Sequence, residues 1–379
     1  MSFAGYEHAL GLLESHRATL PELLPDDCSV VDVHTHLGHD EDGMSLTLEQ
    51  HLDSMRRNHV GTSFVFPLND PERHPAYRVP NDRVLGWASE SEGRLIPFVR
   101  LALDGDDPLA EAERCIDRGA RGIKLHPRSQ AFSVTDPRFE AVFALAAERR
   151  IPVLIHAGRG LPPGLGEELA HIAARHPEAS LILAHAAIAD QGPITSFANG
   201  MPNVFFDTST WSPLDLLSLL ARVGPEQVLF ASDIPYGDQF YHQYLCLGAL
   251  RRVGCTDDQV RAVLGGTASR LIRGELPESI SPPRTGEQIT LELDRVRISS
   301  YLSAVIPLLW AGGMDAIGLL GLAAACCAGN ESLAGVYELV VATEVAWAGL
   351  VDLEPEARRL ETRRLFRVVG LAQALALYG

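Results

Sequence analysis

Short apolar runs alternate with amphipathic segments along the chain before residue 280. The runs show little polar alternation, which is typical of strands buried on both faces of a parallel sheet. We count eight of them, beginning near Val30, Thr62, Leu95, Gly122, Pro152, Leu181, Val204 and Val228. The stretches between them are long enough to hold a helix, so the pattern predicts repeated strand–helix units.

Apolar positions at helical spacing predict the helices of these units. The clearest helices span residues 48–57, 109–118, 138–149, 167–175, 214–223 and 259–273. Eight strand–helix units in about 250 residues match an α/β fold of the (β/α)₈ TIM barrel type, whose active sites lie at the carboxyl ends of the strands. A doubly wound open sheet is the alternative, but it would not bring the ends of the first, fourth, fifth, sixth and eighth strands to one point.

The rest of the chain divides into three further segments. Residues 1–28 predict a helical lead-in without the basic start and apolar core of a signal peptide. The barrel is expected over 29–276, and the prolines of 277–286 indicate a linker. Residues 287–379 predict an all-helical C-terminal domain, with helices near 289–310, 315–327, 333–350 and 355–377.

The role of this helical domain is open at this point. Acidic residues interrupt its apolar stretches before they reach the 18 residues of a membrane span. Its apolar helices could form a homo-oligomer surface, cover the barrel mouth, hold a peptide, or pack as an ordinary bundle. We expect it to modify the barrel without contributing metal ligands.

Composition and charge narrow the class of protein. The formal net charge of −17 argues against nucleic acid or an anionic membrane as a partner, because both require basic patches. The six cysteines show no CxxC pair and no framework spacing, so we expect reduced thiols and a cytoplasmic location.

Candidate metal ligands stand at the ends of several predicted strands. His34 and His36 lie on one face of the first strand, because side chains alternate along a strand. Two imidazoles side by side can bind one divalent ion, although packed or exposed histidines are the alternative for so short a motif. Four later apolar runs end on or next to residues of ligand or metal-bridging type, namely Lys124 with His126, His156, His185 and Asp233.

Seven motifs in order resemble the amidohydrolase superfamily. They are HTHLG at 34–38, GIKLHP at 122–127, IPVLIHAG at 151–158, ILAHA at 182–186, NVFFDTST at 203–210, VLFASDIP at 228–235 and GGTASRLI at 265–272. The branch most similar to the chain is the amidohydrolase-related group, which contains metal-dependent hydrolases and decarboxylases similar to aminocarboxymuconate semialdehyde decarboxylase. The resemblance covers about residues 29–276 and leaves the C-terminal helices outside.

The resemblance implies a role for each matching residue. His34, His36 and Asp233 would bind a first divalent ion, for which Zn²⁺ is the expected metal. His156 would complete that site or bind a second ion with His185. Lys124 stands where binuclear members carry a carboxylated lysine, whereas members with one metal often keep this lysine unmodified.

These residues suit the activation of water. Asp233 can take the proton of the attacking water and pass it to the leaving group, and His185, if it is not a ligand, can stabilise the developing oxyanion. His126 and Arg159 are candidates for contact with the substrate, and each has a structural or surface role as its alternative. We expect Asp207 to orient its neighbours and Trp211 to shape the pocket.

The function expected from the sequence is a metal-dependent hydrolase. Its substrate would contain an amide, lactam, lactone or ester bond in a small molecule or a peptide. A metal-dependent decarboxylase is the alternative, and arginines that face the pocket would favour it.

Overall fold

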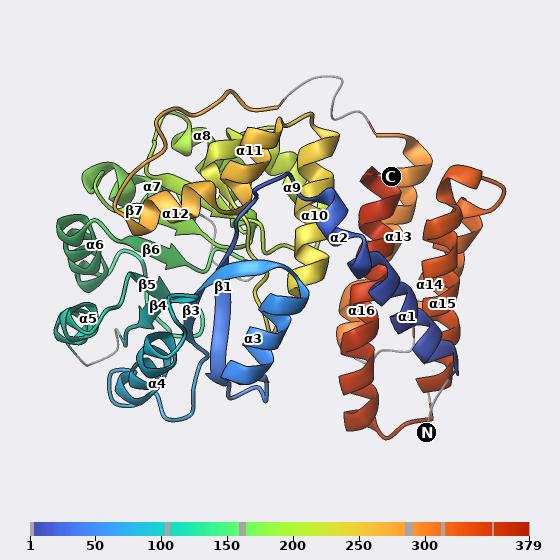
Figure 1. Cartoon of the computed structure of the whole chain (residues 1–379), viewed down its shortest axis with the longest axis horizontal. Helices are drawn as coiled ribbons and strands as arrows, with labels where there is room; N and C mark the ends of the chain where they lie inside the picture. Colours follow the sequence, from blue (N-terminus) through green and yellow to red (C-terminus); the bar gives the residue numbers. More distant parts are fainter. Residues whose placement is uncertain are drawn as a thin grey trace.

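The computed structural model describes residues 4–102, 107–158, 164–284, 291–311, 315–350 and 352–378. One curled sheet organises the first part of this structure (Figure 1). Its eight parallel strands follow one another in chain order, and the short strand β2 (Ser45–Leu46) pairs antiparallel with the end of β1. The parallel strands are β1 (Val30–His39), β3 (Val60–Pro67), β4 (Leu95–Arg100), β5 (Gly122–Leu125), β6 (Pro152–Ile155), β7 (Ser180–Leu183), β8 (Val204–Asp207) and β9 (Val228–Leu229).

Backbone hydrogen bonds link the first strand to the segment that begins with the last strand. Val33 donates to the carbonyl of Phe230 at 3.0 Å, and His36 donates to that of Ile234 at 2.9 Å. The unbroken strand order and these bonds agree with a parallel sheet that curls on itself. A doubly wound sheet would instead reverse its strand order near the middle.

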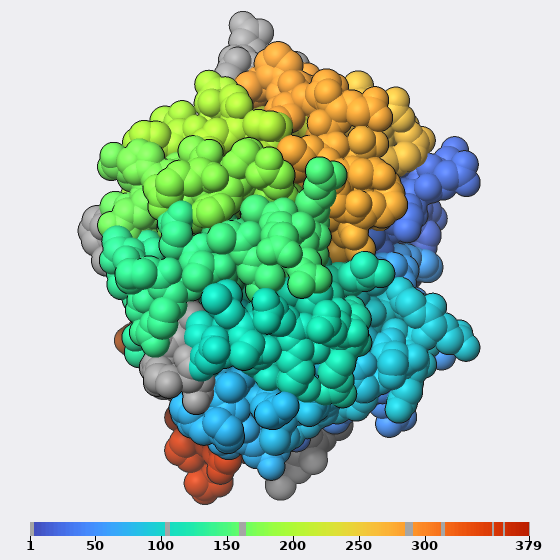
Figure 2. Space-filling model, turned by 90° about the vertical axis from the view of Figure 1, so that its left-hand side faces the viewer, coloured from blue at the N-terminus to red at the C-terminus, as the bar shows by residue number. Residues whose placement is uncertain are grey.

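Helices between the strands cover the outside of the sheet. Figure 2 views this side of the molecule and shows the segments following one another around it, from blue through green to orange. The helices are α3 (Leu48–Arg57), α4 (Arg78–Ser89), α5 (Pro108–Asp117), α6 (Pro137–Arg149), α7 (Leu165–Arg175), α8 (Gln191–Ala198), α9 (Pro213–Leu220), α10 (Gln239–Arg252), α11 (Asp257–Arg261) and α12 (Thr267–Ile272). Short turns of helix also occur at η1 (His185–Ala187), η2 (Pro225–Gln227) and η3 (Ala262–Gly266).

The predicted elements agree with this structure to within a few residues. The eight predicted strand starts fall within two residues of the observed ones. Three helices, α4, α8 and α10, were not among the clearest predictions, and α10 is so fully buried that it shows no polar face to reveal its period. The predicted helix 259–273 is divided into α11, η3 and α12.

Two apolar cores lie on the two faces of the sheet. The smaller core is made largely of side chains from alternate strand positions, including Val31, Val33, Phe64, Phe66 and Phe98. The larger one joins the sheet to its outer helices and continues into the C-terminal helices. Phe66 ends the smaller core directly beside the histidine pair, with ring centroids 5.3 Å from His34 and 4.7 Å from His36.

Four long helices form the C-terminal part of the structure, to the right of the sheet in Figure 1. They are α13 (Leu293–Trp310), α14 (Ala316–Cys327), α15 (Ala334–Leu350) and α16 (Pro355–Tyr378), with the short η5 (Glu331–Leu333) before α15. Helix α16 packs against α13 and α15, and also against α10. Helix α1 (Ala4–Ala18) packs against α15 and α16, and the short α2 (Leu20–Leu23) leads back toward the sheet. The first helix thus packs against the C-terminal helices, although the sequence showed it only as a lead-in.

Glu331–Leu350 is long and apolar enough to cross a membrane by length and composition alone. It is the one such segment among the described residues, and half of its most apolar stretch of 18 residues is buried inside the molecule. The core helix of a soluble protein passes the same test, so this segment is weak support for a membrane span.

The structure describes the predicted linker, residues 277–286, up to residue 284. Ser281 donates from its amide and its hydroxyl to Glu226, both at 2.8 Å, and Arg284 donates its amide to the carbonyl of Leu220 at 2.8 Å. These contacts bind the segment to the helices outside the sheet before the chain enters the C-terminal helices.

Candidate metal centre and active site

The carboxyl ends of the strands bring titratable side chains into one cavity of about 800 Å³. Every predicted strand-end candidate lines it, namely His34, His36, Lys124, His126, His156, His185 and Asp233. The strands are parallel and neighbours along the sheet, so their ends face the same side. Arg159, which we predicted to contact the substrate, lies outside the described residues.

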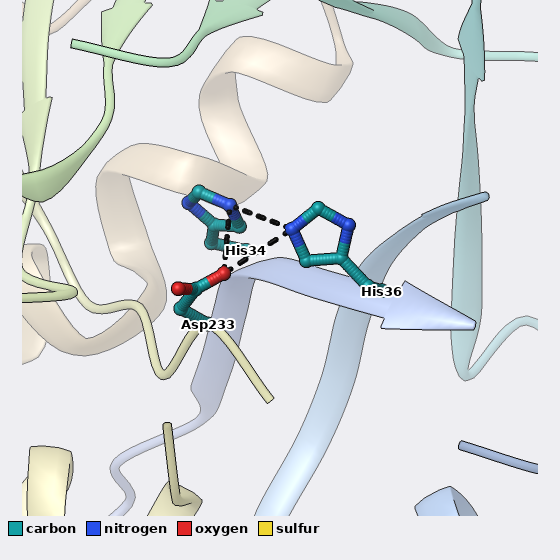
Figure 3. Close-up of side chains that lie close together, drawn as sticks. All are labelled: His34, His36 and Asp233. Atoms are coloured by element: carbon teal, nitrogen blue, oxygen red, sulfur yellow. Dashed lines mark hydrogen bonds and ion pairs between the residues drawn. The ribbon is translucent and has the colours of Figure 1, made fainter. Parts of the chain in front are cut away.

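His34, His36 and Asp233 line this cavity and point toward one another in a compact group (Figure 3). The Nε2 atoms of the two histidines are 3.2 Å apart, and each lies 3.2 Å from Oδ1 of Asp233. Asp233 adopts a left-handed backbone conformation, with φ of 56°, and its amide donates to the carbonyl of His34 at 2.9 Å. This unusual conformation turns the carboxylate toward the histidines.

The protonation states of the group suit a cation. Burial lowers the pKa of both histidines, so both rings are neutral near pH 7. Burial alone would raise the pKa of Asp233, but the nearby histidines hold it below its ordinary value and the carboxylate is ionised. A metal ion needs neutral imidazoles and ionised carboxylates, and these residues provide both.

Asp207 orients the first of these ligands. Its Oδ2 lies 2.7 Å from Nδ1 of His34, and its Oδ1 accepts hydrogen bonds from the amide and the hydroxyl of Ser209. A carboxylate that accepts the Nδ1 proton leaves the Nε2 lone pair of the imidazole free to bind a metal. Asp207 therefore has the orienting role that the sequence predicted for it.

Lys124 of β5 lies beside this group. Its side chain is fully buried, and its Nζ lies 3.0 Å from Nε2 of His34 and 4.7 Å from the ring centre of Phe66. Burial lowers the pKa of Lys124 to about 7. The amine thus lies beside the ligand group, as a bridging lysine would.

Three further histidines line the wall next to Lys124. Nε2 of His185 lies 3.0 Å from Nδ1 of His156, and the ring of His126 stacks on that of His156 with centroids 3.8 Å apart. Nδ1 of His185 lies 2.8 Å from the carbonyl of Ser209, which accepts only, so we assign the ring proton to Nδ1.

This assignment has a consequence for His156. A neutral His185 accepts at Nε2, so His156 donates from Nδ1 and keeps a lone pair on Nε2. That Nε2 is buried and has no hydrogen-bond partner among the described residues. An orphaned lone pair in a wall of histidines is the kind of nitrogen that binds a metal or accepts a proton from a substrate.

The residues present fit a divalent metal. Two neutral imidazoles and one carboxylate converge within 4.8 Å, and the first imidazole is held by an outer carboxylate. Among the described residues, this is the one group of three or more histidines, cysteines or acids whose ligand atoms all lie within 4.8 Å of one another. None of its members comes from the C-terminal helices.

The sequence analysis missed Arg100 as a site residue. The side chain closes β4, faces the cavity and is 1% exposed. It donates to the carbonyl of Pro67 and to Ser129, but it forms no ion pair with an acid among the described residues, and its Nε has no partner there. A charged residue at the end of an apolar strand-like run was the sequence signal that could have identified Arg100 as a site residue.

A family model described as Amidohydrolase matches residues 31–274. The chain belongs to the amidohydrolase family. This match covers the curled sheet with its histidines, lysine and aspartate, and it ends before α13. The members of this family are enzymes and are typically metal-dependent.

Solved structures share the fold of this amidohydrolase at low sequence identity. A TIM-barrel protein from Bordetella bronchiseptica has 14% identity and a TM-score of 0.52, and the match covers 65% of this chain and 99% of that one. A 2,6-dihydroxybenzoate decarboxylase from Rhizobium has 16% identity and a TM-score of 0.52, with the same coverage. A structural genomics target titled as an amidohydrolase has 22% identity and a TM-score of 0.51, over 65% of this chain and all of that one. No curated protein matches the chain.

Proposed function

We propose that this amidohydrolase is a metal-dependent hydrolase that cleaves an amide, lactam, lactone or ester bond of a small molecule or a peptide. The observation that carries the proposal is the group of His34, His36 and Asp233, whose ligand atoms lie 3.2 Å apart in the cavity. The proposal takes the curled sheet as a complete (β/α)₈ barrel and the C-terminal helices as a domain of their own. It takes Zn²⁺ as the metal and the cytoplasm as the location.

The chain's own residues account for the proton transfers. A bound divalent ion would lower the pKa of a water molecule and polarise a carbonyl group. Asp233 takes one proton from the attacking water, whose oxygen bonds to the carbonyl carbon. Asp233 then gives this proton to the nitrogen or oxygen that leaves as its bond to that carbon breaks. His185 donates to the developing oxyanion from Nε2 only in its protonated form, because its Nδ1 proton is directed at Ser209.

Lys124 leaves the number of metal ions open. With its Nζ 3.0 Å from Nε2 of His34, a carboxylated Lys124 would add a carboxylate to this group and would favour a second ion. His156 and His185 would then hold that ion, and the hydrogen bond between Nδ1 of His156 and Nε2 of His185 would be given up. Unmodified, Lys124 remains a polar neighbour of a single ion.

A metal-dependent decarboxylase is the second candidate, and Arg100 favours it. A buried guanidinium that forms no ion pair among the described residues is suited to hold a substrate carboxylate. Arg128, which is exposed and also lines the cavity, adds positive charge at its edge. In that reaction the bond to the carboxyl carbon breaks and carbon dioxide leaves. Asp233 or a histidine then passes a proton taken from water to the remaining carbon.

Metal-reconstituted protein tests both candidates in one screen. A panel of lactones, cyclic amides and esters is followed by titration of released acid, and a panel of aromatic carboxylic acids is followed by carbon dioxide release. The proposal expects metal-restored turnover in the first panel, and Asp233→Asn should lower kcat by about 10²–10⁴-fold while the fold survives. Asp117→Asn, at an exposed aspartate of α5, is the matched control.

The outcomes separate the candidates. Carbon dioxide release that is lost in Arg100→Met, without turnover in the first panel, replaces hydrolysis by decarboxylation. Less than about a tenth of an equivalent of metal per chain, with no turnover restored by added metal, overturns both. Near-normal turnover of Asp233→Asn with its metal retained removes Asp233 from the mechanism.

A further inference from the structure

One face of α13 lines the same cavity as the metal centre. Ser303, Ile306, Pro307 and Trp310 line the cavity, and their spacing of three, four and seven residues places them on one side of the helix. The helix begins beyond residue 274, where the family match ends. The C-terminal region therefore contributes to this pocket, although it supplies none of the three grouped ligands.

An aromatic pair joins this face of α13 to the sheet. Trp310 of α13 lies against Trp211, which follows β8, with ring centroids 5.1 Å apart and ring planes at 48°. Both tryptophans line the cavity and are half-buried, while Ile306 beside them is 3% exposed. Such indole faces present a flat apolar surface, on which another flat apolar group packs well.

The pair is backed on the far side by other helices. Phe366 of α16 lies 5.4 Å from each tryptophan ring, and the guanidinium of Arg363 lies 4.5 Å from the ring centre of Trp310. The hydroxyl of Tyr241 in α10 donates to the backbone carbonyl of Trp211 at 2.9 Å. These contacts hold the two rings in place before any ligand arrives, which lowers the entropic cost of binding one.

The elements that line the cavity thus differ in chemistry. The strand ends present histidines, Lys124, Asp233 and Arg100, whereas α13 and Trp211 present mostly carbon. A small polar substrate would leave the apolar side chains of α13 and Trp211 facing water. A substrate with an apolar group could cover these side chains with that group.

We propose that Trp211, Trp310 and Ile306 form a subsite for an aromatic or similarly flat apolar substituent of the substrate, away from the bond that reacts. The proposal rests on the proposed function only in taking this cavity as the substrate site. It gives α13 a role in substrate specificity, in addition to the residues at the ends of the strands.

Pairs of simple acids that differ only in a phenyl group test this subsite. Phenylacetate, 3-phenylpropionate and 4-phenylbutyrate are compared with acetate, propionate and butyrate by isothermal titration calorimetry on the full chain, with and without metal. Burying a phenyl ring should make the best phenyl acid bind about tenfold or more tightly than its partner. Quenching of tryptophan fluorescence gives an independent readout, because two of the four tryptophans line the cavity.

Two variants change the subsite in opposite ways. Trp310→Ala removes one ring, and Ser303→Phe fills the space from the same face of α13. Both should reduce the phenyl preference to less than about threefold while the affinity for the short acids stays the same. Trp87→Ala, on α4 and outside the cavity lining, is the control and should keep the preference. Circular dichroism and thermal unfolding confirm that each variant is folded.

The possible failures are distinguishable. A phenyl preference that disappears in both variants supports the subsite even if the protein holds no metal and turns over nothing. A preference of less than threefold in the unaltered chain, or one that survives in both folded variants, overturns the subsite even if metal-dependent turnover is found.

Discussion

At the scale of single residues, the metal centre depends on carboxylates that fix the orientation and the protonation of neighbouring side chains. Asp233 closes the group of three, and Asp207 holds the outer nitrogen of His34. Asp32 supports the same strand from beneath, since it is fully buried and accepts hydrogen bonds from Ser232 and Gln239. These contacts give Asp32 a structural role one layer below the ligands.

Asp207→Asn should weaken metal binding without removing a ligand. The amide keeps the shape of the side chain but accepts the Nδ1 proton of His34 less strongly, and loss of such outer partners typically costs about 10–100-fold in metal affinity. Competition with a chromogenic chelator measures the dissociation constant, with the exposed Asp117→Asn as the control. An unchanged constant in a folded variant would show that His34 needs no orienting carboxylate.

His51 gives a prediction about pH and stability that is separate from the metal centre. Its side chain is fully buried in α3, both ring nitrogens lack a partner among the described residues, and burial lowers its pKa to about 3. The unfolded chain takes up a proton below about pH 6.5 and the folded chain does so only near pH 3, so this residue reduces stability as pH falls. The loss has a slope of up to about 1.4 kcal/mol per pH unit.

His51→Leu should remove this slope. Urea unfolding between pH 7 and pH 4, with chelator present throughout, should show a smaller loss of the free energy of unfolding for the variant than for the unaltered chain. The exposed His8→Leu is the matched control and should leave the slope unchanged. Equal slopes in all three proteins would contradict the assignment.

At the scale of elements, two glycines let α10 and α16 approach each other. A Cβ atom on Gly248 of α10 would lie 2.2 Å from the ring of Tyr378, and one on Gly370 of α16 would lie 2.6 Å from the ring of Tyr241. Each helix thus accepts a tyrosine of the other. The tyrosine hydroxyls donate to the carbonyls of Trp211 and Pro213, so this contact supports the loop that carries Trp211.

Gly370→Ala should destabilise the protein although alanine favours helices. The fully buried ring of Tyr241 has to move to admit the new methyl group, and overpacking of this kind typically costs about 1–3 kcal/mol. Gly318→Ala in α14 is the matched control, because nothing lies within 4 Å of its Cβ position, and it should stabilise by about 0.5–1 kcal/mol. Thermal unfolding measures both, and stabilisation by both would contradict the close contact.

At the scale of the whole molecule, the first helix and the C-terminal helices form one group at the side of the sheet. Helix α1 packs against α15 and α16, and α16 packs against α10 (Figure 1). The C-terminal helices thus carry one wall of the cavity and also bury the first helix. Oligomerisation through their outer faces stays a proposal, and Leu322, Tyr337 and Val345 are large apolar side chains exposed there.

Removal of residues 285–379 should leave metal binding but remove the phenyl preference. The three grouped ligands lie before residue 234, whereas Ile306 and Trp310 are lost with α13. We expect lower solubility, because α10 and α1 lose their partners, so a second variant also lacks residues 1–18. Metal content and calorimetry with the phenyl acids measure the outcome. Loss of metal from a folded truncated chain would show that the C-terminal helices maintain the centre.

The sequence by itself determined the parallel strands and the order of the candidate ligands. Strand-like runs such as 151–155 are apolar throughout because both faces of the sheet are covered, and that property is local. The HxH spacing places His34 and His36 on one face for the same local reason. Lys124, His156, His185 and Asp233 followed because parallel strands end on one side.

Only the tertiary structure decided which distant surfaces meet. No local pattern distinguishes Trp310 in a cavity wall from Trp347 in a helix core, since both stand in apolar helices. The pairing of α1 with α15, and the absence of an acidic partner for Arg100 among the described residues, likewise depend on contacts between segments far apart in the chain. Periodicity records which side of an element is apolar, but the partner of that side is chosen by shape and by the packing of the complete molecule.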